Sequence, residues 1–583
     1  MSTEDYELPI TSPTTSKHPR KPSIAEDIIP KHMRLVDFTV EIPSSARTTS
    51  LPNEGAKNPS RWRTPEFRFY YVVAAVVIPV MIWIPVTLSD PSHPNYPFYK
   101  GRLSQGWILG RPVDNSDAQY RSFRNNIPVL TVIASILFLA KWIWSKACVT
   151  TARTTPNKLH LLPFNLVCSL LFLSGLHGTS LIKIIGILTV NFLIARVCRA
   201  SKLSPILTWA FNGMILFMND RYNGYRFGDI LPSLEILDAF EGFHPRWHIS
   251  FNITMLRLVS FNMDYYWSCR GIGSNEIGSH LNERQRQNVS HPDDTYSFVN
   301  YLAYALYSPL YIAGPIITFN DFLWQFRQPQ PIARSTVIRY LVRFLASLLT
   351  MEFILHFMYV VAIKDKKAWM GDSPAEISMV GFWNLVIVWL KLLIPWRFFR
   401  LWALADGVDP PENMVRCVAN NYSTFGFWRS WHRSYNLWII RYIYVPLGGA
   451  RNVFVNSVLV FTFVALWHDL TFKLLAWGWL VSLFILPEML ARFSLPASRY
   501  GTKPWYRHVC ALGAVLNILL MMTANLVGFV IGTEGIQFFI DRLFGTMEGL
   551  KFLVGAVCCL FVGAQLMFEY REEEMRNGIY RRC

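Results

Sequence analysis

The chain contains 583 residues, of which 52% are hydrophobic and only 16% are charged. Soluble globular proteins average about 25% charged residues, so this composition predicts an integral membrane protein. Aromatic residues reach 15%, with 21 tryptophans, and tryptophan and tyrosine gather at membrane–water interfaces. Collagen-like chains, disulfide-framework miniproteins and largely disordered chains are excluded.

The net charge of +17 comes from 56 Lys and Arg against 39 Asp and Glu. In a soluble protein this excess would raise the question of nucleic-acid binding. In a membrane protein it belongs to cytoplasmic loops and anionic headgroups, so we expect no nucleic-acid partner. Nine cysteines without a CxxC pair give neither a disulfide framework nor a zinc-site spacing, and most should be buried free thiols.

The N-terminal residues 1–65 are rich in Pro, Ser, Thr and mixed charge, which predicts a disordered tail. No apolar stretch precedes Phe69, so we expect the first hydrophobic segment to be retained as a helix rather than cleaved as a signal peptide. Residues 66–583 then form the transmembrane domain. Basic residues flank the early spans on both sides and leave the side of the N-terminus open, whereas the charged run Glu569–Cys583 predicts a cytosolic C-terminus.

Apolar stretches suited to membrane helices follow along the chain. The first, Phe69–Leu88, contains Pro79 and Pro85, which should kink it. The other candidate spans are Ile127–Trp144, Leu161–Leu176, Leu181–Val197, Leu203–Met218, Phe298–Phe319, Val337–Ala362, Met379–Ile394, Val453–Leu466, Leu470–Leu486, Val509–Ile531 and Phe552–Phe568. The chain is therefore predicted to be an all-α polytopic membrane protein with about ten to twelve helices, some tilted or re-entrant.

Two further segments are harder to assign. Ile249–Tyr266 mixes apolar with charged and amide residues and fits either a buried span or an interfacial amphipathic helix; we favour the buried span. Ser268–Thr295 is polar and predicts an aqueous loop. No internal repeat of fixed period is visible, which gives no support to an inverted-repeat transporter.

His468 follows an apolar run that ends in Leu466-Trp467, and another apolar run resumes after Asp469. Desolvation of ionisable groups is costly inside a membrane, so such groups usually serve a pathway, a relay or a reaction. A loop pair at the junction of two short helices is the alternative. The local sequence leaves both interpretations open.

His432 lies in FWRSWHRSYNLW, residues 427–438, where aromatic residues recur at helical spacing. By itself this pattern is typical of an interfacial helix with an aromatic belt. The stretch is joined to His468 through Arg441–Arg451, which contains a Pro-Leu-Gly-Gly turn that permits sharp redirection of the chain. This connection favours a site that contains both histidines.

Together these strings resemble the core of the membrane-bound O-acyltransferase family: WRSWHRSYN, then RYIYVPLGG, then LWHD. The strings GPIITFNDF, LLIPWRFFRLWAL, PENMVRCVANNYS, LSQGWILGRPVDNSDAQYR and FEYREEEMRNGIYRRC are similar to the fungal glycerol-uptake-protein branch of that family. The resemblance covers most of the chain after about residue 61. It implies a helix bundle around an acyl tunnel, with the catalytic core in residues 314–490.

The resemblance implies that His468 and His432 form the catalytic pair, with acyl-CoA entering from the cytosolic face as co-substrate and no tightly bound cofactor. A hydroxyl acceptor needs a positioned base, and the thioester carbonyl needs donors for its developing oxyanion. We expect His468 to remove the acceptor proton and His432 to orient the acceptor or stabilise the tetrahedral species. Burial disfavours the imidazolium and so keeps each histidine available as a base.

The neighbouring residues are weaker candidates. Ser434, Tyr435, Asn436 and Trp438 are expected to shape the site, and Arg429 and Arg433 to meet the phosphates of CoA; structural roles at the headgroup layer are the alternative. Cys417 resembles a cysteine that ligates haem in the related protein-acylating branch, with an ordinary thiol as the alternative. His244 and His248 have i,i+4 spacing, but Pro245 interrupts any helix, so we interpret HPRWH as a loop and not as a metal site.

Within this branch, the implied activity is the remodelling of glycosylphosphatidylinositol (GPI) anchors. A long saturated acyl chain would pass from acyl-CoA to the sn-2 hydroxyl of the lyso-GPI lipid, in the endoplasmic reticulum membrane, with the plasma membrane as a second location. The partners would be acyl-CoA, the lyso-GPI lipid and membrane lipids. The alternative is a proton-coupled glycerol transporter, which should show paired midplane acidic groups and discontinuous helices in matching halves; the sequence shows neither.

Overall fold

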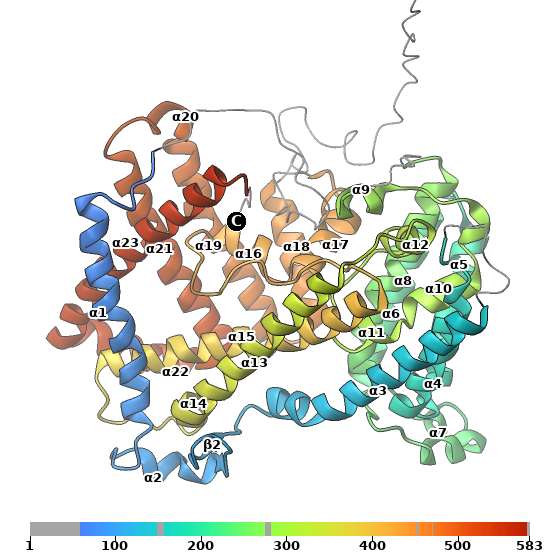
Figure 1. Ribbon diagram of the computed structural model, residues 1–583, viewed down its shortest axis with the longest axis horizontal. Coiled ribbons are helices and arrows are strands. Elements are labelled where there is room, and N and C mark those ends of the chain that lie inside the picture. The colour runs from blue at the N-terminus through green and yellow to red at the C-terminus, as the bar shows by residue number, and fades with distance from the viewer. Residues whose placement is uncertain (1–58, 149–156, 274–280, 450–452, 469, 580–583) are drawn as a thin grey trace, which may run out of the picture.

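The computed structural model describes residues 59–148, 157–273, 281–449, 453–468 and 470–579, and these fold almost entirely into α-helices (Figure 1). The predicted tail therefore lies, up to residue 58, outside the described residues. Within the described part of the chain the one sheet is a short antiparallel hairpin of β1 (Leu103–Ser104) and β2 (Val113–Asp114).

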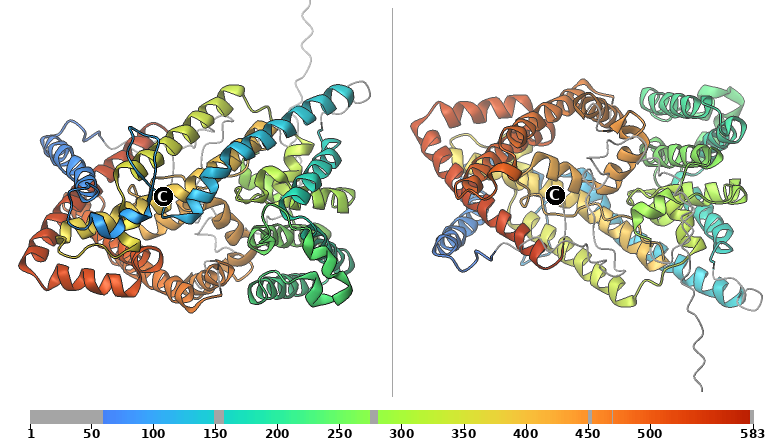
Figure 2. Two further views of the ribbon diagram at one scale, coloured as in Figure 1. Left: turned by 90° about the horizontal axis from the view of Figure 1, so that it is seen from below. Right: turned by 90° about the horizontal axis from the view of Figure 1, so that it is seen from above.

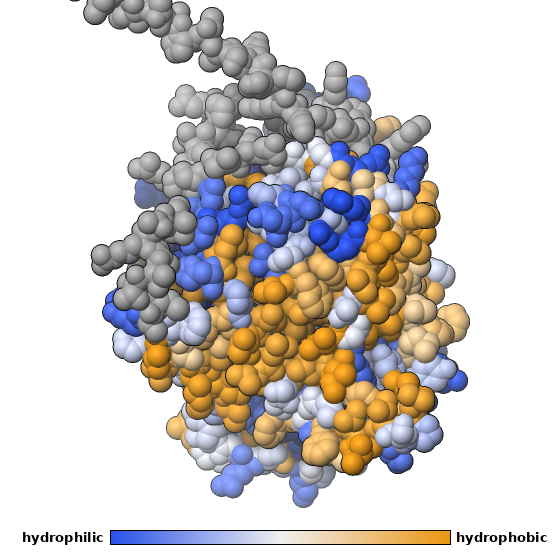
Figure 3. Space-filling view, turned by 90° about the vertical axis from the view of Figure 1, so that its right-hand side faces the viewer, coloured by the Kyte–Doolittle hydropathy of each residue, from blue (hydrophilic) through white to orange (hydrophobic). Residues whose placement is uncertain are grey.

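Seven helices of the described residues are long and apolar enough, by length and composition, to cross a membrane. They are α1 (Pro65–Leu88), α3 (Ala118–Cys148), α5 (Ser180–Cys198), α15 (Pro374–Asp406), α19 (Phe472–Ser494), α21 (Tyr506–Asn525) with the π-helix η7 (Leu526–Val530), and α23 (Met547–Arg576). Figure 3 shows an apolar band across the middle of the face turned to the viewer, with more hydrophilic residues above and below it. The prediction of an all-α polytopic membrane protein is confirmed.

Five other helices have 16 to 24 residues. They are α4 (Leu161–His177), α6 (Leu203–Arg221), α8 (Trp247–Cys269), α13 (Arg334–Phe357) and α18 (Val453–His468). None of these five is among the seven candidate spans of the described residues, so the count of about ten to twelve membrane helices stays a prediction.

Short elements connect these helices. They are α2 (Tyr96–Tyr99), η2 (Lys100–Arg102), α7 (Phe227–Ile230), η3 (Pro232–Ala239), α9 (Glu283–Asn288), η4 (Asp293–Thr295), α10 (Phe298–Ala305), α11 (Ser308–Tyr311), α12 (Phe319–Arg327), α14 (Val360–Asp365), α16 (Thr424–Ser430), α17 (Arg433–Ile439), the π-helix η5 (Ile440–Tyr444), α20 (Ala497–Tyr500) and α22 (Gly532–Phe544). Seen from below and from above, the helices of residues 161–327 gather at one end of the molecule, and α1 with α21–α23 at the other (Figure 2).

Helix α8 is the central element of the first of these groups. Every residue from Thr254 to Trp267 is buried, so its polar side chains face protein rather than headgroups. The preference for a buried span over an interfacial helix is confirmed.

The span predicted at Phe298–Phe319 is wrong. The structure breaks it into α10, α11, a non-helical segment 312–318 and the start of α12. Proline removes a backbone donor from a helix and weakens its interior, and Pro309 and Pro315 lie in this stretch. The guanidinium of Arg257 in α8 donates to the carbonyl oxygens of Ala305 (2.9 Å) and Leu310 (2.5 Å), which lie where α10 and α11 end. The segment is thus an interrupted, buried part of the core and not one continuous helix.

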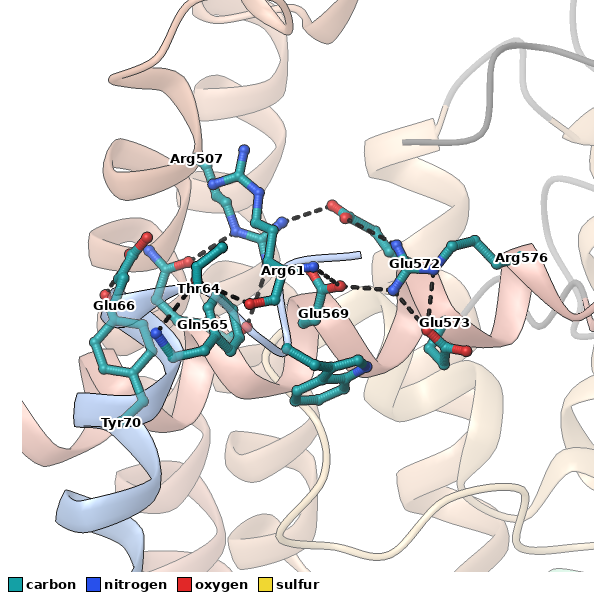
Figure 4. A network of polar contacts seen from close by, with 12 residues as sticks. Arg61, Thr64, Glu66, Tyr70, Arg507, Gln565, Glu569, Glu572, Glu573 and Arg576 are labelled. Atoms are coloured by element: carbon teal, nitrogen blue, oxygen red, sulfur yellow. Dashed lines mark hydrogen bonds and ion pairs between the residues drawn. The ribbon is translucent and has the colours of Figure 1, made fainter. Parts of the chain in front are cut away.

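The first and last helices are tied together at one end of the molecule. The backbone N–H of Arg61 donates to Glu569 of α23 (2.9 Å), and Arg507 of α21 and Arg576 of α23 also contact this carboxylate, at 3.4 and 2.6 Å (Figure 4). The side chain of Glu569 is 0% exposed. The structure therefore fixes the start of α1 against the C-terminal helix.

Two hydrophobic cores meet in the middle of the bundle. One is built from α8, α10–α12 and α17, and includes Tyr435, Trp438 and Trp467. The other is built from α13–α15 and includes Trp396, with Trp431 packed against it. Residues 431–438 lie where these two cores adjoin.

Candidate active site

His432 lies at a sharp turn between α16 and α17. Its backbone has φ +47° and ψ 49°, the left-handed region that a non-glycine residue adopts at a cost of about 1–3 kcal/mol. The flanking residues are held on both sides: Trp431 forms an isolated antiparallel bridge with Met414, and Arg433 N–H donates to the carbonyl oxygen of Asn413 (3.0 Å). Such strain persists only where neighbours fix it, and it is concentrated at functional sites.

The broken segment 312–318 reaches the same turn. Ser434 Oγ accepts a hydrogen bond from the backbone N–H of Ile316 (2.9 Å), and Ser434 N–H donates to Asn413 Oδ1 (3.1 Å). Ile316 belongs to the GPIITFNDF string. Two segments, those of Ile316 and Asn413, therefore converge on Ser434, two positions after His432.

The structure brings the two predicted histidines together through an aromatic chain. The ring of Trp396 stacks on the imidazole of His432 at 4.5 Å between centroids. On its other side, His432 contacts Tyr435 (5.2 Å), Tyr435 contacts Trp467 (4.6 Å), and Trp467 contacts His468 at the end of α18 (4.8 Å). The two imidazoles are near enough to interact electrostatically.

Both imidazoles keep accessible surface. Protein atoms surround each of them closely, yet His432 is half-buried and His468 exposed, whereas Tyr435 and Trp467 between them are buried. Neither imidazole is therefore fully covered by protein.

The four residues predicted to shape the site divide into two pairs. Ser434 and Trp438 are buried and hydrogen-bonded, Trp438 through its Nε1–H to the carbonyl oxygen of Leu256 (2.9 Å). Tyr435 Oη and Asn436 Oδ1 are buried polar atoms without a hydrogen-bond partner among the described residues. The first pair holds the turn in place, and contact of the second pair with a substrate stays a prediction.

The two arginines predicted to meet CoA differ in their surroundings. Arg433 has a side chain only 2% exposed and forms a 2.5 Å ion pair with Glu283 of α9. The guanidinium of Arg429 lies over the ring of Phe425 at 5.5 Å. A contact between Arg433 and a phosphate would compete with Glu283, and both phosphate contacts stay predictions.

Sequence reasoning missed Glu283 because the stretch around it was interpreted as an aqueous loop. The structure forms the short helix α9 there, begun by a reciprocal capping box in which Asn282 and Gln285 each accept the other's backbone N–H. That spacing of a capping residue and Gln was a readable signal of a helix start. Trp396 and Asn413 were also missed, since their contacts with the turn are tertiary.

The remaining candidates lie apart from the histidines. Cys417 is an exposed thiol on the segment between α15 and α16, and haem ligation by it stays a prediction. The loop interpretation of HPRWH is wrong in part, because His248 lies within α8 while His244 precedes it. Across the described ranges no three His, Cys, Asp or Glu side chains form a metal-binding group. Asp469 lies outside the described residues.

The fold and this site define a polytopic membrane protein with two histidines that keep accessible surface and are linked through buried aromatic side chains. A family model, described as MBOAT, membrane-bound O-acyltransferase family, matches residues 239–533. The chain is 47% identical over 538 residues to "Membrane-bound O-acyltransferase GUP1" of Saccharomyces cerevisiae, which covers 90% of this chain and 94% of that protein. It is 40% identical over 559 residues to "Membrane-bound O-acyltransferase gup1" of Schizosaccharomyces pombe, covering 93% and 95%.

A more distant relative is "Protein-cysteine N-palmitoyltransferase HHAT" of Mus musculus, 26% identical over 273 residues that cover 43% of this chain and 53% of that protein. The chain belongs to the membrane-bound O-acyltransferase family, in the branch of the fungal GUP proteins. It is a membrane-bound acyltransferase.

Proposed function

We propose that this acyltransferase moves a long-chain acyl group from acyl-CoA to the free hydroxyl of a lyso-GPI lipid in the endoplasmic reticulum membrane. The observation that carries the proposal is the pair His432 and His468, which keep accessible surface and are joined through Tyr435 and Trp467. The GUP relatives support the branch. The acceptor and the location come from the resemblance to that branch.

The chemistry follows from the side chains at the site. His468 accepts the proton of the acceptor hydroxyl as its oxygen attacks the thioester carbonyl carbon. His432 orients the acceptor, and the unpartnered Tyr435 O–H donates to the oxyanion of the tetrahedral species. When that species collapses, the carbon–sulfur bond breaks and the CoA sulfur takes the proton from His468. Exclusion of water by the surrounding helices protects the thioester from hydrolysis.

The test is acyl transfer by the purified protein in vesicles, with labelled acyl-CoA and lyso-GPI lipid. His468→Ala should lower the turnover number by at least about 100-fold. The matched control is His508→Ala, which changes a histidine of α21 outside the candidate site and should retain wild-type turnover. Lysophosphatidylcholine as acceptor and free fatty acid as donor test the two substrates separately. Turnover by His468→Ala at the wild-type rate would refute the role of His468.

The glycerol-transport alternative is tested in the same vesicles by glycerol flux. Transport is favoured if wild-type vesicles make no acyl product but pass glycerol, and if that flux survives His432→Ala combined with His468→Ala. Acyl product without flux supports the acyltransferase proposal. The location is tested by fractionation of cellular membranes.

A further inference from the structure

The left-handed backbone of His432 requires support from the residue that follows it. The peptide between His432 and Arg433 sets the ψ of one residue and the φ of the next, so a fixed Arg433 fixes that peptide. Arg433 is anchored at its backbone by Asn413 (3.0 Å) and at its buried guanidinium by Glu283 (2.5 Å). The carboxylate of Glu283 is the side-chain anchor at this turn.

Helix α9, which carries Glu283, is itself held in place by neighbouring segments. Besides its capping box, helix α9 is joined to α12 by the ion pair of Arg286 with Asp321, at 2.5 Å and with Asp321 0% exposed. Asn288, the last residue of α9, accepts a hydrogen bond from Arg441 of η5 (2.5 Å). Helix α9 is thus held by both α12 and η5. Glu283 therefore has little freedom to follow Arg433 if that residue moves.

The charge on Glu283 is stable. Burial alone raises the pKa of this carboxyl, but the guanidinium groups of Arg433, Arg286 and Arg400 together lower the pKa of Glu283 below its ordinary value. The carboxylate therefore stays ionised throughout the neutral range. An uncharged residue at this position would remove the carboxylate that faces the buried guanidinium of Arg433.

We propose that Glu283 is a positioning residue for acyl transfer: its carboxylate holds Arg433, and Arg433 holds His432 in the left-handed conformation that aims the imidazole at the acceptor. The proposal rests on the function proposed above and adds a residue to it. Glu283 touches neither substrate nor reacting atoms in this scheme. A displacement of a catalytic group by about 1 Å costs up to about 100-fold in rate.

A competing role for Arg433 gives the opposite kinetic signature. If Arg433 binds the phosphates of the donor, Glu283 competes with acyl-CoA, and Glu283→Gln should lower the KM for acyl-CoA. If Glu283 positions His432, the variant should lower kcat by about 10- to 100-fold and leave that KM within about two-fold of wild type.

The experiment compares variants of the full-length protein in vesicles with acyl-CoA and lyso-GPI lipid. They are Glu283→Gln, the charge-reversed pair Glu283→Arg with Arg433→Glu, and the control Asp117→Asn, which breaks the 2.8 Å ion pair with Lys391 between α3 and α15. We expect low kcat in Glu283→Gln, at least about ten-fold recovery in the charge-reversed pair, and wild-type kcat in the control.

Thermal unfolding of each sample separates positioning from misfolding. Glu283→Gln and Asp117→Asn should unfold at similar temperatures, so that a loss of kcat in the first alone is not a loss of folded protein. Wild-type kcat in folded Glu283→Gln, or a lowered KM for acyl-CoA, would overturn the positioning role while leaving the acyltransferase intact. Wild-type protein that makes no acyl product would overturn the proposed function and, with it, this inference.

Discussion

Substitution of Glu569 by Gln tests the contact that ties the first helix to the last. Glu569 accepts from the backbone of Arg61 and from Arg507 and Arg576 (Figure 4). Gln keeps the size and one acceptor oxygen but removes the charge. Arg507 retains Glu572 at 2.7 Å and Arg576 retains Glu573 at 2.7 Å, so neither guanidinium is left without a carboxylate.

The expected cost follows from these contacts. Breaking a buried ion pair completely costs about 3–5 kcal/mol, and a hydrogen bond to a charged group contributes about 1.5–3 kcal/mol. Because both arginines keep a second partner, we expect Glu569→Gln to lower the free energy of unfolding by about 2–3 kcal/mol. Glu573→Gln is the control: its side chain is 39% exposed, and an exposed ion pair contributes little to stability, so its loss should leave the free energy of unfolding close to that of wild type.

The assay is unfolding in detergent, followed by intrinsic fluorescence, together with trypsin cleavage at the arginines that precede α1. Glu569→Gln should unfold at lower temperature and be cut faster before α1 than wild type, because the backbone of Arg61 loses a charged acceptor. A variant with wild-type stability and wild-type cleavage would show that the network at Glu569 contributes no net stability, and the reasoning would fail.

Three further changes have defined outcomes. Ser434→Ala removes the acceptor of Ile316 N–H; it should cost about 1–3 kcal/mol and lower kcat, as measured by thermal unfolding and acyl transfer. Arg257→Met leaves the carbonyls of Ala305 and Leu310 without their donor and should destabilise by about 2–4 kcal/mol; a stabilised variant would mean that the cost of burying the guanidinium is larger. Burial chiefly, and the neighbouring Glu376, raise the pKa of Asp372 to about 6, so wild-type stability should fall as the pH rises from about 4 to about 6 and level off above. Asp372→Asn should remove that fall and be more stable by about 1–2 kcal/mol at about pH 7, with no difference at about pH 4, in unfolding measured across pH.

The sequence predicted the membrane helices well because each is marked by local composition. α5 and α18, for example, start and end within two residues of the predicted limits. The break at Phe298–Phe319 was not predictable in this way, since the carbonyls that end α10 and α11 are satisfied by Arg257, 48 and 53 positions away. Hydropathy reports how apolar a segment is. A segment buried inside the protein can be as apolar as a helix that crosses the membrane, so hydropathy does not separate the two.

The sequence singled out the two histidines of the candidate site, but it did not indicate how the backbone around them is arranged. His432 and His468 stand out because ionisable residues are rare in apolar surroundings, and the structure places both against the unit formed by Tyr435 and Trp467. The left-handed backbone of His432 has no local signal, and the contacts that adjoin it, from Arg433 to Asn413 and to Glu283, are tertiary. Contacts of this kind appear only once the chain has folded.

Part of the positive net charge lies near the turn that carries His432, where it is paired with negative charge. Three arginines there, Arg433, Arg441 and Arg286, each form an ion pair with a carboxylate, at 2.5, 2.9 and 2.5 Å. Buried pairs contribute little net stability, but removing one partner is costly, so such pairs favour a single arrangement of the segments that carry them. The segments here are α8, α9, α12, α17 and η5. These charges therefore act first on the geometry of the turn.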